Sequence, residues 1–330
     1  MFDTKRGTTL LHQDWPEAKW NISGLFQNRL LIRILVSTME HENISHVLDS
    51  IQGSPDLLWN GGYPNANVPN PPDSPKFFKQ LNDRGIGAFL DFSNSLIEEK
   101  HLSEVNSNRL LETLDEESGL NGVIVASDLL SDHIRMKKPG LKQICSIIKN
   151  FTENPDGNIE WYIKMQERFD RVAIHPDHVF DPDLLDKLDR DKAEILVNDE
   201  CLYKCPNRKR HQTLNSRYNI TGSKDILNEI GKLRQTSCAG GIGVLSEKKN
   251  PEHLRSCYMK QKELKTIYDM GFRNFKIEGR RMTMNSLGWN VINFIINPAL
   301  SAPYSAILAH KIDQNIRQEF QKMAQKEDAL

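Results

Sequence analysis

No stretch of this sequence is apolar for long enough to cross a membrane, and its start lacks the form of a secretory signal. A transmembrane helix needs about 20 consecutive apolar residues, and no run in the 330-residue chain approaches that length. The first residues, MFDTKRGTTLLHQDW, contain no apolar signal-peptide stretch. With a negative mean hydropathy, the sequence predicts a soluble, cytoplasmic protein with no membrane span.

A strong net charge and the short motifs of several enzyme classes are also absent. The formal net charge of −1 argues against a protein that coats nucleic acid electrostatically, but leaves room for a local basic patch. There is no G-x-x-x-x-G-K-[ST] motif, and the AGGIG run at residues 239–243 lacks the strand-to-helix setting of a dinucleotide fold, so no nucleotide cofactor is expected. Neither G-x-S-x-G nor H-E-x-x-H occurs, which leaves no visible peptidase nucleophile or zinc-bound water.

Short apolar runs alternate with amphipathic stretches, the pattern of a parallel sheet with crossover helices. The runs predicted to be strands are residues 31–36, 56–59, 87–91, 122–126, 142–148, 171–174, 194–197 and 274–277. Helices are predicted at residues 75–83, 104–114, 161–169 and 182–189. Eight such units favour a closed (β/α)8, TIM-type barrel of the α/β class over an open doubly wound sheet. The first and fifth runs can also be interpreted otherwise.

The chain is predicted to be a single barrel domain over residues 1–330. Its length and 38% hydrophobic content are enough for a full core. Residues 199–272, between the last two predicted strands, are far longer than an ordinary crossover and are interpreted as a cysteine-bearing insertion. Residues 299–330, rich in Lys, Gln and Glu, are predicted to form a C-terminal helical cap.

Four of the five cysteines, Cys201, Cys205, Cys238 and Cys257, lie in that segment. Disulfides are rare in a reducing cytoplasm, and four thiolates gathered where two strands end can hold one metal centre. Structural zinc usually takes two C-x2-C pairs, whereas here one pair is C-x3-C and the next ligands follow after 32 and 18 intervening residues. The spacing favours an iron-sulfur cluster over zinc, with unligated cysteines as a third alternative. Cys145 lies in an apolar run and is predicted to be a small buried residue.

Polar residues follow most of the predicted strands, and in a barrel these ends meet on the face that carries the active site. Examples are Asn60, Ser93 with Asn94, Ser127 with Asp128, His175 with Asp177, Asn198, and Glu278 with Arg280. The alternative for each of them is a helix N-cap or a turn, as for Ser127.

Several segments resemble the collagenase-like peptidase family, called U-thirty-two in peptidase classifications. They are GFRNFKIEGRRM with the preceding KELKTIYDM, and LVNDECLYKCPNRKRHQ, while GIGAFLDFSN and NGVIVASDLLSDHIR are similar to one branch of that family. The resemblance is strongest between residues 85 and 290. It implies a barrel with a 4Fe-4S cluster on Cys201, Cys205, Cys238 and Cys257. Members of the broader family act in oxygen-independent hydroxylation of RNA bases or of a quinone precursor, with prephenate as hydroxyl donor in some. The chain lacks the C-terminal extension of longer members and differs in cysteine spacing, so the substrate is not carried over.

Lys276, Glu278 and Arg280 match the F-K-I-E-G-R strand of that family. Alternation along a strand puts all three on one side, with Ile277 on the other. If that side is the barrel interior, we expect the charged residues near its mouth, where burial costs less. Glu278 is predicted to be a general base, with Arg280 as its charge partner or as the anchor of a substrate carboxylate. A buried structural ion pair is the alternative.

His175 is a second candidate for catalysis, with packing or hydrogen bonding as the alternative. The basic run after Cys205 contains Arg208, Lys209, Arg210 and His211. It could tune the cluster or bind a dicarboxylate or phosphate, or it could be a solvated turn. The candidate substrate-binding residues are Arg280, Arg208, Arg210, His211 and Asn60.

The predicted function is an iron-sulfur enzyme that hydroxylates or otherwise modifies a nucleobase or a small aromatic molecule. Its expected partners are a small anionic molecule, such as prephenate as co-substrate, or RNA. A peptidase or other hydrolase with structural cysteines is the alternative. A further alternative is a non-catalytic accessory subunit, since family members can work as heterodimers with a related barrel subunit.

Overall fold

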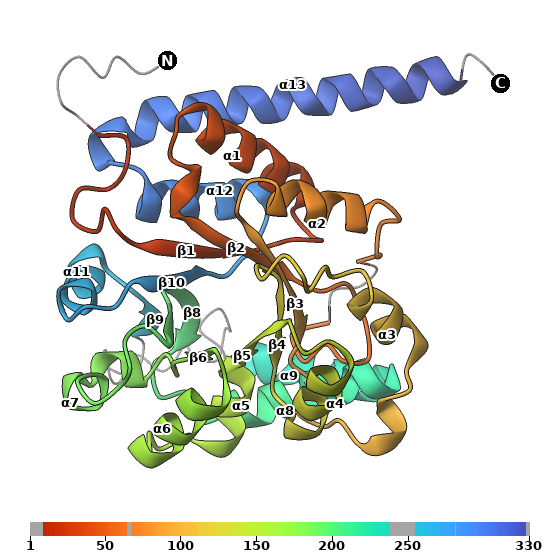
Figure 1. Cartoon of the computed structure of the whole chain (residues 1–330), viewed down its shortest axis with the longest axis vertical. Coiled ribbons are helices and arrows are strands. Elements are labelled where there is room, and N and C mark those ends of the chain that lie inside the picture. The colour runs from red at the N-terminus through yellow and green to blue at the C-terminus, as the bar shows by residue number, and fades with distance from the viewer. Residues whose placement is uncertain (1–8, 65–67, 238–254, 281, 328–330) are drawn as a thin grey trace.

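The computed structural model describes residues 9–64, 68–237, 255–280 and 282–327. Its centre is a closed barrel of parallel strands in the order β1-β10-β7-β6-β5-β4-β3-β2, which confirms the predicted TIM-type barrel (Figure 1). The strands are β1 (Lys19–Ser23), β2 (Leu48–Gly53), β3 (Gly87–Phe92), β4 (Gly122–Val125), β5 (Lys142–Cys145), β6 (Arg171–Ala173), β7 (Ala193–Leu196) and β10 (Asn274–Ile277).

Helices surround the barrel and pack on its outer surface (Figure 1). They are α1 (Arg29–His41), α2 (Ser74–Asn82), α3 (Val105–Leu111), α4 (Asp128–Lys137), α5 (Ile147–Glu153), α6 (Ile159–Arg168), α7 (Pro182–Leu185), α11 (Gln261–Asp269) and α12 (Met284–Ile295). Short 3-10 helices are η2 (Ser45–Val47), η3 (Glu99–His101), η4 (His178–Phe180) and η6 (Pro298–Leu300). Ser127 is the N-cap of α4, where its side chain accepts from the Leu130 N–H, so the capping interpretation of this residue is confirmed.

Two predicted strands are wrong, and two real strands were missed. Residues 31–36 belong to α1, whose apolar residues are buried at helical spacing. Residues 56–59 form a turn. The strands β1 and β2 escape an apolar-run search because every second residue is polar and points into the barrel, as Asn21 and Gln52 do. The predicted strand at 142–148 divides at Ser146, which caps α5.

One half of the barrel interior is apolar and the other half is charged. Phe89, Ile124 and Ile144 form a small cluster of their own inside the barrel. Opposite them, the buried carboxylate of Glu194 lies 3.5 Å from Lys276 Nζ and 3.9 Å from Arg171 Nη1. Lys276 lies opposite Asn21 of β1 and Leu196, the last residue of β7, and Glu194 balances its charge.

Between β7 and β10, the described part of the predicted insertion contains a two-stranded sheet and a pair of helices, followed by α11. The strands β8 (Asn198–Leu202) and β9 (Ser256–Tyr258) pair antiparallel. The helices α8 (Arg208–Thr221) and α9 (Lys224–Ser237) pack on each other. The long C-terminal helix α13 (Ser301–Glu327) lies against α1 and α12, where Tyr304 and Leu308 are buried (Figure 1).

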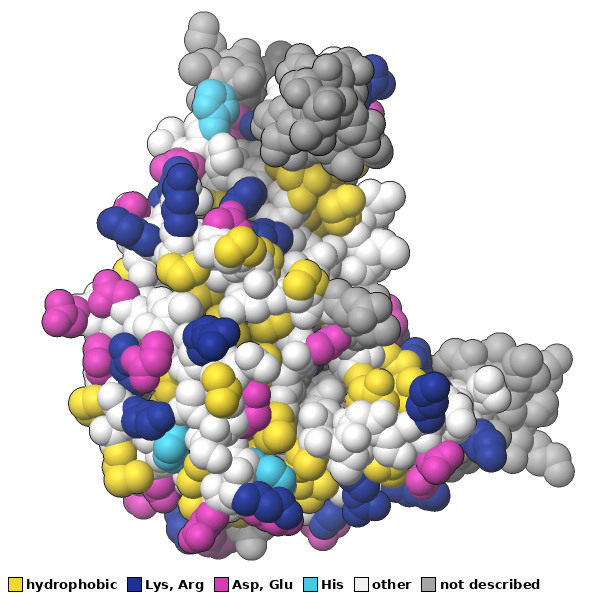
Figure 2. Space-filling model, turned by 90° about the vertical axis from the view of Figure 1, so that its right-hand side faces the viewer, with side chains coloured by type: hydrophobic (Ala, Val, Ile, Leu, Met, Phe, Trp, Pro, Cys, Tyr) yellow, Lys and Arg dark blue, Asp and Glu magenta, His cyan; other side chains and the backbone are white. Residues whose placement is uncertain are grey.

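The surface mixes charges of both signs. On the face in Figure 2, Lys and Arg side chains lie beside Asp and Glu side chains, in keeping with the net charge of −1. Among the described helices, none combines the length and apolar character that a bilayer crossing requires.

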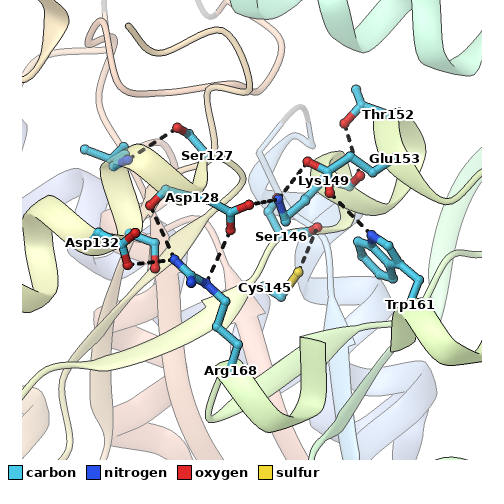
Figure 3. Close-up of polar contacts among 12 residues, drawn as sticks. Ser127, Asp128, Asp132, Cys145, Ser146, Lys149, Thr152, Glu153, Trp161 and Arg168 are labelled. Carbon is cyan, nitrogen blue, oxygen red and sulfur yellow. Dashed lines mark hydrogen bonds and ion pairs between the residues drawn. The ribbon is translucent and has the colours of Figure 1, made fainter. Parts of the chain in front are cut away.

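A charged network joins the three outer helices α4, α5 and α6. Figure 3 shows Lys149 of α5, whose side chain is 1% exposed, between Asp128 Oδ2 at 3.0 Å and Glu153 Oε1 at 2.7 Å. Arg168 of α6 also contacts Asp128, at 3.3 Å. Cys145 lies beside this network with its side chain fully buried, as predicted, and burial raises the pKa of its thiol.

Candidate active site at the carboxyl end of the barrel

The cysteine segment meets the barrel at Arg208, the first residue of α8, which is 5% exposed. Its guanidinium contacts Asp177 Oδ1 at 2.9 Å, Asp199 Oδ2 at 3.0 Å and the Leu202 carbonyl at 2.7 Å. Asp177 follows β6 and Asp199 lies in β8, so the arginine joins the chain segments after two neighbouring barrel strands. Burial alone lowers the pKa of Arg208, but the neighbouring thiols and carboxylates outweigh it and raise this pKa.

Three of the four predicted cluster ligands lie around Arg208. Cys257 Sγ accepts from Arg208 Nη2 at 3.4 Å and donates to Asp177 Oδ1 at 3.3 Å. Burial raises the pKa of the Cys257 thiol. A hydrogen bond between the other two thiols raises the pKa of Cys201 and lowers that of Cys205 to about 6. Cys238 lies outside the described residues.

The chemistry of these donors suits a soft metal centre, because thiolates are the usual ligands of iron-sulfur clusters. Arg208 would offset the negative charge of such a centre. Within the described part of the chain, however, no group of three Cys, His, Asp or Glu side chains is placed to hold one metal ion. The 4Fe-4S cluster therefore stays a prediction.

His175 follows β6 and is 3% exposed. Its Nδ1 accepts from the Asp177 backbone N–H at 3.0 Å, and its ring stacks on His178 with 4.4 Å between ring centres. Burial, with His178 and Arg208 nearby, lowers the pKa of His175 to about 2. Because Nδ1 is an acceptor, the neutral ring carries its proton on Nε2. His175 can therefore donate a hydrogen bond from Nε2, as a neutral imidazole.

The F-K-I-E-G-R strand brings Arg280 to the barrel mouth. Its Nη2 donates to Asp91 Oδ2 at 2.7 Å, and its side chain is 9% exposed. Glu278 is partly buried; its N–H donates to Asn198 Oδ1 at 2.7 Å, and its carbonyl accepts from Asn198 Nδ2 at 2.9 Å. The charge partner that the structure gives Arg280 is thus Asp91 of β3.

The remaining candidate residues have different surroundings. Asn60 is buried, and its side chain shapes its own loop by bonding Pro55 and Gly62. Arg210 has a side chain that is 62% exposed and pairs with Glu229 of α9 at 2.6 Å. His211 is partly buried on α8. The run 208–211 is therefore divided, with Arg208 inside the site and Arg210 on the surface of the segment.

Sequence reasoning named Asp177 after β6, but it assigned no acidic partner from this set to Arg208 or Arg280. Asp91, Asp177 and Asp199 each bind an arginine at the mouth. Asp91 could have been found from alternation in β3, because it lies two residues after Phe89, which faces the barrel interior. The other two follow strand ends, but nothing in the sequence indicates that Arg208 contacts both.

No protein-family model and no curated protein matches this chain. Among solved structures, it is similar to the U32 peptidase Mk0906, with 14% sequence identity and a TM-score of 0.47. The match covers 79% of this chain and 92% of that chain. At this level of similarity, the activity has to be argued from the residues of the chain itself.

Proposed function

We propose that this chain is an iron-sulfur enzyme of the U-thirty-two type, which modifies a nucleobase or a small aromatic molecule by oxygen-independent hydroxylation. The observation that carries the proposal is the gathering of cysteines around one buried arginine. The β8–β9 pair brings Cys201 and Cys257 into one small sheet, Cys205 lies just before α8, and Arg208 bonds Cys257 directly. The F-K-I-E-G-R resemblance supports the same assignment.

In this proposal Cys201, Cys205, Cys238 and Cys257 hold the cluster, which would supply one-electron chemistry when bound. Arg208 offsets the negative charge of the thiolates, while Asp177 and Asp199 fix its orientation.

In the same proposal, residues that follow the barrel strands bind and activate the substrate. Arg280 anchors a carboxylate of an anionic co-substrate such as prephenate, for which the guanidinium fork is suited. His175 donates a hydrogen bond from Nε2 to a substrate oxygen. Glu278 is the candidate general base, to be tested by substitution.

Anaerobic purification followed by iron and sulfide analysis tests the cluster. Replacing any one of the four proposed ligands with Ser should abolish iron binding, because each thiolate is a ligand. Cys145→Ser is the matched control and should keep its iron, since this thiol faces the outer helices. Equal iron loss in the control, or zinc in place of iron, would contradict the assignment.

Binding of prephenate by calorimetry tests the anion site. Arg280→Ala should retain iron and lose binding, whereas Glu278→Gln should retain both and lose turnover. Arg33→Ala is the control, because this arginine is 46% exposed on α1, away from the mouth. Peptide-bond cleavage by iron-free protein would instead support a hydrolase. A second barrel protein required for activity would support an accessory role.

A further inference from the structure

The loop after β2 approaches the barrel mouth so closely that a Cβ added at either of two glycines would overlap a neighbouring atom. A Cβ on Gly61 would lie 1.9 Å from the Ser93 carbonyl oxygen, and one on Gly62 would lie 1.2 Å from Nη1 of Arg280. Both distances are far inside van der Waals contact. Neither glycine has a positive φ, so the neighbouring atoms impose the requirement and the backbone conformation does not.

Asp91 holds the guanidinium of Arg280 from another side. Asp91 comes from β3 and Arg280 follows β10, so their 2.7 Å contact spans the mouth above β1 and β2. The second oxygen of Asp91, Oδ1, is buried without a hydrogen-bond partner among the described residues. An arginine side chain has many accessible rotamers, and here the ion pair and the glycine contact restrict them before any ligand binds.

Asparagine side chains hold the glycine loop in its place. Asn60 Oδ1 accepts from the Gly62 N–H at 2.9 Å. From α8, Asn219 Nδ2 donates to the Asn60 carbonyl at 2.7 Å and to the Gly62 carbonyl at 2.9 Å. The loop is therefore tied to the helix whose first residue, Arg208, lies among the cysteines.

We propose that Asp91 and Gly62 are positioning residues that fix Arg280 at the barrel mouth, an arrangement called the arginine seat below. Asn219 connects this seat to the cysteine segment. The seat gives Arg280 one defined orientation, so that binding an anion does not require ordering a flexible side chain. The reason for such a seat rests on the proposed function, in which Arg280 is the anion anchor. The tests of the seat use neither iron nor turnover.

A double-mutant cycle of thermal stability tests the glycine contact. Gly62→Ala should lower the melting temperature, because the new Cβ collides with the guanidinium. In an Arg280→Ala background the same change should cost less than half as much, since the colliding group is gone. Gly231→Ala on α9 is the matched control, because a Cβ there meets nothing within 4 Å. Equal losses in both backgrounds would overturn the glycine seat.

Chemical labelling tests the orientation of Arg280 itself. Phenylglyoxal modifies accessible arginines, and peptide mass spectrometry follows each site, with the exposed Arg33 as internal reference. In the wild-type protein Arg280 should react several-fold more slowly than Arg33. Asp91→Asn should speed its labelling several-fold, and Asp91→Glu, which keeps the carboxylate, should restore slow labelling. A purely structural role for Asp91 would change the melting temperature without this selective effect at Arg280.

A substitution of Asn219 tests the hydrogen bonds that connect the glycine loop to α8. Asn219→Ala should also speed labelling of Arg280, whereas Asn315→Ala on α13, whose side chain bonds the Lys311 carbonyl of the same helix, should not. Unchanged labelling in Asp91→Asn and Asn219→Ala would overturn the proposal. An intact seat in protein that binds no iron would contradict the proposed function alone, and active iron-loaded protein without the seat would contradict this inference alone.

Discussion

Glu194 shows how a charge is accommodated inside this barrel. Its side chain is 1% exposed, and its Oε2 accepts from Gln52 Nε2 at 3.3 Å. Lys276 and Arg171 lie on either side of it, and Asp49 pairs with Arg171 at 2.9 Å. A buried ion pair adds little stability compared with apolar packing, but removing one partner leaves the other charge uncompensated.

Glu194→Leu should therefore destabilise the protein by about 3–5 kcal/mol, because Lys276 loses its buried counter-charge. Urea unfolding measures the loss. The control is Asp186→Asn, which breaks a surface pair with Arg190 at a side chain that is 74% exposed, and it should cost at most about 1 kcal/mol. A similar small loss in both variants would show that Glu194 does not balance the interior charge.

His175 predicts an acid-sensitive fold. Its folded-state pKa of about 2 lies below the unfolded value of about 6.5. Below about pH 6.5 the unfolded chain therefore binds a proton that the folded chain excludes, and stability falls as the pH falls toward the folded pKa. Burial also lowers the pKa of His178, so the two stacked rings act in the same direction.

From pH 7 to pH 5, His175 should account for a loss of about 2 kcal/mol, at about 1.4 kcal/mol per pH unit below the unfolded pKa. His175→Gln should show a correspondingly shallower decline in urea unfolding across this range. His41→Gln, at a side chain that is 62% exposed, should keep the wild-type decline. Parallel curves for the wild-type protein and His175→Gln would contradict the assignment.

At the scale of elements, the sequence predicts those helices and strands that have a regular spacing of apolar residues. The helices α2, α3 and α6 and the strands β3, β4, β6, β7 and β10 lie where their apolar periodicity puts them. The strands β1 and β2 were missed because their inward residues are polar. Such residues are stabilised inside the barrel by partners on strands distant in sequence, as Gln52 is by Glu194. Residues 31–36 carry enough apolar residues for a buried strand and become a helix face instead.

For the candidate site, the sequence likewise predicts some features and not others. The residues Cys201, Cys205, Cys257, His175 and Arg280 could be named from residue type and motif. Alternation in β3 indicates that Asp91 points inward, but not that it binds Arg280. The contacts of Gly62 and Asn219 at the mouth could not be predicted, because they come from the β2 loop and α8 through tertiary packing alone.

Helix α8 should depend on its first residue for its attachment to the barrel. Arg208→Gln leaves the buried carboxylates of Asp177 and Asp199 without their counter-charge. Hydrogen exchange followed by mass spectrometry should then be faster over residues 198–221, while β3, β4 and β5 keep their protection. Arg210→Gln, which breaks only a surface pair, should leave exchange unchanged. Faster exchange throughout the barrel would show that Arg208 supports the whole fold and not this segment.

At the scale of the whole molecule, pairing between the first strand, β1, and the last strand, β10, closes the barrel. Strand β1 pairs with β2 on one side and with β10 on the other, so residues 19–23 lie against residues 274–277. Trp20 of β1 packs on Phe275 of β10 and Phe294 of α12. A fold closed in this way has no part that can detach at the N-terminus without opening the sheet, so we expect a single cooperative unfolding transition.

Deleting residues 1–23 should abolish cooperative unfolding. The deletion removes the side chains of Trp20 and Ile22, which are 1% and 0% exposed, and each large buried side chain is worth about 2–5 kcal/mol. It also exposes the edges of β2 and β10. These losses approach the total stability of about 5–15 kcal/mol that is usual for a domain. Removing residues 313–330 is the matched control, because Tyr304, Leu308 and the Lys311 bond to Thr38 are kept. Circular dichroism and urea unfolding should show a cooperative transition for the control and none for the N-terminal deletion. A cooperative transition in the N-terminal deletion would mean that the barrel holds together without its closing strand.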